Sequence, residues 1–159
     1  LTNSNVENLE EYTLLFDHMY SLERRTNANV GESNMATSGR VRFSNPIFKL
    51  ANAEWSQKLT DILINGVMVN EIEIVRVANI GKVNEIVEKD IFKNSYLQFI
   101  SKRTDALFME VRIEDYTTSL THVDQDTKQK GTVVAHYSVM TGKNSISAEG
   151  AGGEGGGAE

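Results

Sequence analysis

The chain has 159 residues, of which 40% are hydrophobic, and a formal net charge of −6 at pH 7. This length supports one domain with a sizeable core. The absence of cysteine excludes disulfides, thiolate zinc sites and cysteine nucleophiles. The acidic balance argues against nucleic acid as a partner. No apolar run approaches the ~20 residues of a membrane span, and the first residues lack a signal-peptide core.

The first predicted element is a strand between Tyr12 and Leu22. Apolar and aromatic residues alternate there, although residues 9–25 also fit one face of a helix. The aromatic density favours the strand, because aromatic side chains suit a pleated surface.

A small, polar segment without periodicity follows, from Thr26 to Gly39. Such a segment is typical of a long loop. It serves either as an arm that reaches a partner subunit or as plain disorder. Arginines flank it, and they form either a patch that meets an acidic neighbouring copy or a solvated patch. These arginines are Arg24, Arg25, Arg40 and Arg42.

The segment from Arg42 to Arg76 indicates a strand, a helix and a second strand. Pro46 cannot donate to a ladder, so the strand from Phe43 to Leu50 is expected to be interrupted or at an edge. A helix is predicted from Asn52, a candidate N-cap, to Ile64, with a stop at Asn65-Gly66. The helix carries one apolar stripe, formed by Trp55, Leu59, Ile62 and Leu63. After it, isoleucines and glutamates alternate as in a half-buried strand.

The rest of the chain is predicted as further strands. Residues 78–102 favour a short helix or turn followed by a strand, because residues 83–91 have helical spacing. Two alternating strands follow at 107–116 and 131–140, joined by a charged loop over 122–130. The Gly/Glu-rich segment 141–159 has almost nothing to bury and is expected to be a flexible tail.

The sequence contains no catalytic or metal-binding signature. Its three histidines, His18, His122 and His136, lie on different predicted elements without ligand spacing. Asp124 and Asp126 resemble the start of a calcium loop, but Lys128 stands at a ligand position. No GxSxG or GxxxxGK[ST] pattern occurs. We therefore expect no catalytic residues, no cofactor and no metal.

The order of these elements resembles the haemolysin-coregulated proteins (Hcp), the inner-tube subunits of bacterial type VI secretion, and the related tail-tube proteins of contractile phages. The resemblance spans roughly residues 12–140. It is carried by Gly39, Val41, Phe43, Ser56, Leu59, Gly66, Ile72, Ile74 and Arg76.

The resemblance implies a mainly β fold, a compact barrel of two packed sheets with one flanking helix over residues 1–140. It implies a structural subunit of stacked hexameric rings, with a contractile sheath, a spike protein and effectors as partners. Such a subunit is assembled in the bacterial cytoplasm and then secreted. Alternatives are another self-assembling phage-tail, virion or filament β-subunit, and a small ligand-binding β-domain. The predicted inter-subunit contacts are Arg24, Arg25, Asn29, Val30, Glu32, Met35, Arg40 and Arg42.

Overall fold

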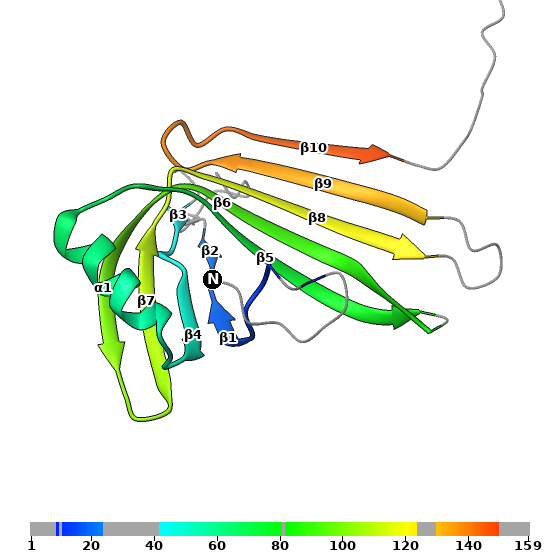
Figure 1. Cartoon of the computed structure of the whole chain (residues 1–159). Helices are drawn as coiled ribbons and strands as arrows, with labels where there is room; N and C mark the ends of the chain where they lie inside the picture. The colour runs from blue at the N-terminus through cyan, green and yellow to red at the C-terminus, as the bar shows by residue number, and fades with distance from the viewer. Residues whose placement is uncertain (1–8, 10, 24–41, 81, 124–129, 150–159) are drawn as a thin grey trace, which may run out of the picture.

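The computed structural model describes residue 9 and residues 11–23, 42–80, 82–123 and 130–149. In these residues the chain forms ten strands and one helix (Figure 1). The predicted loop over 26–39, six residues of the charged loop and the last ten residues lie outside the described residues. Helix α1, from Trp55 to Asn65, is not long and apolar enough to cross a membrane, and it is the only helix in the described part.

Five strands form a large sheet in the order β5, β6, β8, β9, β10, and all neighbours are antiparallel. These strands are β5 (Val69–Ile80), β6 (Val83–Lys102), β8 (Asp115–Val123), β9 (Lys130–Ser138) and β10 (Asn144–Glu149).

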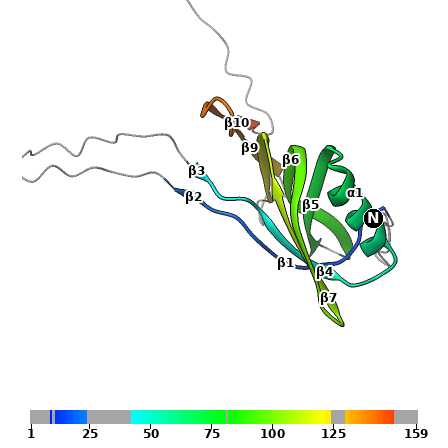
Figure 2. The ribbon, with the colours of Figure 1, turned by 90° about the vertical axis from the view of Figure 1, so that its left-hand side faces the viewer.

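A small sheet lies against the large one and has the order β1, β4, β7, β6. Its other strands are β1 (Leu15–Met19), β4 (Ile47–Ala51) and β7 (Ala106–Arg112). Two short strands, β2 (Leu22–Glu23) and β3 (Arg42–Phe43), pair with each other and project away from both sheets (Figure 2). The structure confirms the predicted mainly β fold of two packed sheets with one helix.

Strand β6 belongs to both sheets, because its first half pairs with β5 and β8 and its second half pairs with β7. The helical interpretation of residues 83–91 is therefore wrong, whereas the alternative of a turn leading into a strand agrees with the turn at Lys82 and with β6. The register shifts show one extra β6 residue at Val87 and another at Gln98, and Asn94 has a positive φ of 51°. Bulges bend a strand and disturb its alternation. Because Val87 is an extra residue in the strand, two apolar residues, Ile86 and Val87, follow each other directly. This break in the alternation reproduces the spacing of a helix.

The core lies between the two sheets and consists mainly of side chains from β4, β6 and β7. Phe48, Phe92, Leu107 and Val111 are almost completely buried. The predicted alternating face is confirmed for β7, where Leu107, Met109 and Val111 are all buried. Ile113, the fourth residue of the predicted face, is also buried but lies just after the strand. The strand ends earlier than predicted, because the chain turns after Arg112 and begins β8 at Asp115.

Helix α1 packs its apolar stripe against the core, with Trp55 and Leu59 buried. Asn52 is not the N-cap, because the helix begins three residues later; the Asn52 side chain instead accepts a hydrogen bond from the Ser56 hydroxyl. The predicted stop is confirmed. Gly66 has a φ of 61°, and the amides of Gly66 and Val67 close the last turn as in a Schellman motif.

Pro46 interrupts the predicted strand from Phe43 to Leu50, as expected from its missing N–H. The strand after it is not an edge, because β4 lies between β1 and β7. The expected flexible tail over 141–159 is wrong for Asn144–Glu149, which forms β10 and pairs with β9. Backbone hydrogen bonds to β9, and not burial of side chains, stabilise this strand. Its polar composition therefore carried no signal that would predict a strand.

Candidate assembly surfaces

The two-stranded arm formed by β2 and β3 is fixed at its base by aromatic side chains. Tyr20 lies between β1 and β2, and Phe43 belongs to β3. Their rings stack with centroids 5.5 Å apart and an interplanar angle of 8°. Phe43 also contacts Tyr116 and Tyr137 of the large sheet. Offset aromatic pairs of this kind stabilise a contact beyond simple burial, so the arm leaves the body from a defined position.

Beneath these rings lies the buried carboxylate of Asp90 on β6. The Tyr116 hydroxyl donates to Asp90 Oδ1 at 3.0 Å, and the Tyr20 hydroxyl lies 3.3 Å from Asp90 Oδ2. The two hydroxyls are 2.6 Å apart. Burial raises the pKa of both tyrosines above the usual value. The two phenols therefore stay protonated, and their two protons supply the donors of a hydrogen-bond network around a carboxylate that is out of water.

The large sheet carries an apolar overhang, which we define as Leu120, Val133 and Ile146. Their exposed fractions are 49%, 46% and 71%. The constant registers of β8, β9 and β10 place them on the same face as the buried Tyr116 and Tyr137. Figure 1 shows β8, β9 and β10 extending beyond the small sheet. The core-facing side of the large sheet therefore continues as an uncovered apolar surface.

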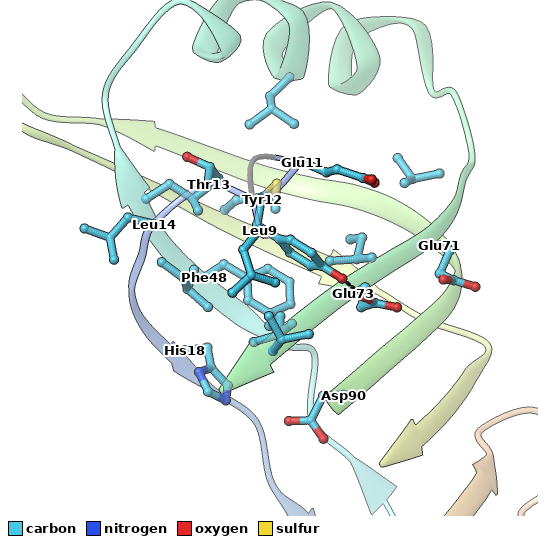
Figure 3. A pocket seen from close by; sticks show the side chains of 18 of the residues that line it. Leu9, Glu11, Tyr12, Thr13, Leu14, His18, Phe48, Glu71, Glu73 and Asp90 are labelled. Carbon is cyan, nitrogen blue, oxygen red and sulfur yellow. Dashed lines mark hydrogen bonds between the residues drawn. The ribbon is translucent and has the colours of Figure 1, made fainter. Parts of the chain in front are cut away.

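A slot opens between β5 and the segment leading into β1 (Figure 3). It has a volume of about 1110 Å³, and core side chains such as Phe48 and Leu97 form its floor. Tyr12 lies in the slot, and its hydroxyl donates a hydrogen bond to Glu73 on β5. The pKa of Tyr12 is raised to about 12, and the largest cause is this hydrogen bond, with burial as the second.

The structure describes only one of the eight predicted inter-subunit residues. Arg42 is exposed on β3, where it pairs in register with Glu23 of β2. The other predicted contacts lie outside the described residues: Arg24, Arg25, Asn29, Val30, Glu32, Met35 and Arg40. Arg42 is thus a predicted contact residue that lies exposed on the arm formed by β2 and β3.

The histidines do not converge. His18 on β1 stacks beside Tyr20, His122 is on β8, and His136 on β9 lies 3.7 Å from an Asp115 oxygen. The described residues contain no group of three or more metal-ligating side chains. Asp124 and Asp126 of the rejected calcium loop lie outside the described residues.

Sequence reasoning missed the Asp90 network and the overhang. Asp90 lies in a segment whose apolar spacing predicts a helix, and Ile146 lies in a segment whose composition predicts a tail. The aromatic density around Tyr20 was the one available signal, but it could not indicate which strand the ring would meet.

The fold is similar to that of solved proteins of type VI secretion. A structure described as a type six secretion system protein has a TM-score of 0.73 at 14% identity, with 91% of each chain covered. Hcp1 from Salmonella typhimurium has a TM-score of 0.65 at 15% identity, covering 89% of this chain and 90% of its own. Hcp1 from E. coli EAEC 042 also has a TM-score of 0.65, at 12% identity, with coverages of 92% and 86%.

No protein-family model matches the sequence, and no curated protein matches it. The likeness is therefore one of structure, and it spans about nine tenths of the chain. It agrees with the resemblance that the sequence suggested. The chain has the Hcp fold.

Proposed function

We propose that the chain is a structural subunit that assembles with copies of itself into stacked hexameric rings, forming the inner tube of a contractile injection system of the type VI kind. In this role the tube is surrounded by a contractile sheath, is tipped by a spike protein and delivers effectors. The subunit is made in the bacterial cytoplasm and leaves the cell with the tube. The proposal assigns it no catalytic step.

The overhang carries the proposal. Leu120, Val133 and Ile146 have the alternation of a core face but remain in water in a single chain. Exposed apolar surface of this kind marks an interaction site. A neighbouring subunit would cover it, and closed rings also protect exposed strand edges. The Hcp fold points to the same kind of assembly.

The arm supports the second level of assembly, the stacking of rings. Its base is held by the Tyr20–Phe43 stack, and Arg42 presents a cation on a protein with a net charge of −6. A cation on a projection favours contact with an acidic neighbouring copy. We propose that residues 24–42 make this contact.

The native mass and particle shape test the proposal. Light scattering and negative-stain microscopy are expected to show rings, and stacked tubes at high concentration. Deletion of residues 26–39 is expected to leave rings but impair stacking. A strict monomer at high concentration would refute the assembly role. A deletion variant that stacks normally would refute only the role of the arm.

A further inference from the structure

The slot is bordered by two strand edges without partners in the described part of the chain. Strand β5 hydrogen-bonds to β6 alone, and β1 hydrogen-bonds to β4 alone. An edge strand presents a row of free N–H and C=O groups that can pair with an added strand. The β5 edge is long, since residues 69 and 71–77 line the slot.

The floor of the slot is the hydrophobic core itself. Phe48 and Leu50 of β4 and Leu97 of β6 line it, and all three are buried. Ile72 and Ile74 of β5 are only partly buried, although they pack against this core. A side chain that entered from the slot would therefore remove additional apolar surface from water, which is the main favourable term in association.

The rim of the slot is acidic. Five carboxylates line the slot as a whole, against one lysine and one arginine. Of the five, Asp90 is buried, and Glu88 and Glu73 form ion pairs with Arg76 and Lys89. On β5, Glu71 and Glu73 alternate with Ile72 and Ile74. Side chains directly opposite each other on neighbouring strands interact, and opposite charges stabilise the pair. The β5 edge therefore favours an added strand that has apolar residues opposite the isoleucines and basic residues opposite the glutamates.

The chain's own N-terminal segment fills the slot only in part. Tyr12 and Leu9 point into it (Figure 3). The Tyr12 hydroxyl bonds to Glu73, but no backbone hydrogen bond joins the described residues among 9–14 to β5. Within the part of the chain that the structure describes, the edge groups of β5 therefore have no backbone partner beside Tyr12.

We propose that the slot is a strand-acceptor site. It binds one extended segment of a partner protein, in which apolar residues alternate with lysine or arginine, as an added strand on β5. At about 3.3 Å per residue, the lining part of β5 accommodates a segment of about eight residues. This inference rests on the slot and goes beyond the tube role.

Calorimetry with a synthetic peptide of about eight residues, alternating lysine with valine, tests the site. We expect binding to the full chain. A peptide of the same composition with its lysines and valines in two blocks, and one with alternate backbone amides methylated, are expected to bind at least tenfold more weakly, because they lack the alternation or the N–H donors. Amide hydrogen exchange is expected to slow along β5 when the alternating peptide binds.

Charge reversal tests the rim. The substitution Glu71→Lys is expected to weaken binding of the lysine–valine peptide about tenfold and to strengthen binding of a glutamate–valine peptide. Glu71 is exposed, so the fold tolerates the change. Asp105→Lys, the same reversal at an exposed position that does not line the slot, is the control and is expected to change neither affinity.

Several results would overturn the proposal. These are no binding of the alternating peptide, equal binding of the methylated peptide, or unchanged exchange along β5. Self-association that the peptide abolishes would place a second copy in the slot instead of a partner. Because ring and tube formation is measured separately, a failure here leaves the assembly role standing, and a monomeric protein that binds the peptide leaves the slot proposal standing.

Discussion

The hydroxyl oxygens of Tyr20 and Tyr116 lie 2.6 Å apart, and both approach the buried carboxylate of Asp90. Each phenol has one proton, so two protons serve three contacts. The two shorter contacts assign Tyr116 as the donor to Asp90 and Tyr20 as the donor to Tyr116. This chain of hydrogen bonds joins the base of the arm to the middle of the large sheet.

Removal of the Tyr116 hydroxyl is therefore expected to destabilise the fold. Tyr116→Phe keeps the ring but takes the 3.0 Å donor from a buried carboxylate. We expect a loss of about 1–3 kcal/mol in the free energy of unfolding, measured in urea. The control is Tyr96→Phe at a 38% exposed position, where a change within about 0.5 kcal/mol is expected. Equal effects at the two positions would contradict the network.

Stability is expected to fall at alkaline pH. Tyr12, Tyr20 and Tyr116 all have a raised pKa in the folded state. Above pH ~10 the unfolded chain releases these protons while the folded chain retains them, so unfolding is favoured. For Tyr12 the loss runs from the ordinary value of 10.0 to about 12.

Tyr12→Phe isolates this contribution. Between pH ~10 and ~12 its free energy of unfolding is expected to fall less steeply than that of the unchanged protein. All groups other than Tyr12 are the same in both proteins, so the difference between the two slopes reports Tyr12. Identical slopes would show that the hydrogen bond to Glu73 does not persist in solution.

The end of α1 depends on a left-handed residue. Gly66 has a φ of 61°, and a Cβ there would meet no atom within 4 Å. The cost of Gly66→Ala is therefore conformational and is expected to be about 1–2 kcal/mol in thermal or urea unfolding. Gly66→Asn is expected to cost less, because asparagine tolerates this conformation. A larger loss for asparagine than for alanine would contradict this reasoning.

The overhang gives a prediction that separates assembly from folding. Ile146 is 71% exposed, so Ile146→Asp is expected to change the free energy of unfolding of the single chain by less than about 0.5 kcal/mol. The same change is expected to prevent ring formation, because a carboxylate would then lie in an apolar contact.

The matched control is Ser145→Asp, which places a carboxylate on the opposite face of β10. Sedimentation velocity is expected to show rings for Ser145→Asp and single chains for Ile146→Asp. If both variants formed rings, the overhang would not be part of the interface between subunits.

Local pattern predicted the elements whose side chains alternate without interruption. The inward face of β7, the apolar stripe of α1 and the stop at Gly66 follow from residue spacing and turn chemistry. The pattern misled at β6, because the bulge at Val87 reverses the alternation, and a bulge depends on pairing with another strand. It also failed at β10, where the stabilising partner is the backbone of β9.

The sequence by itself determined an acidic, mainly β chain without cysteine, the helix α1 with its fixed end at Gly66, and the alternating face of β7. Only the tertiary structure decided which strands become neighbours, that β6 serves two sheets, and that Asp90 meets Tyr20 and Tyr116. The physical reason is that strand pairing and burial are long-range. A strand's own residues specify which of its faces is apolar, but the partner strand decides whether that face is covered, as in the core, or left open, as at the overhang and the slot.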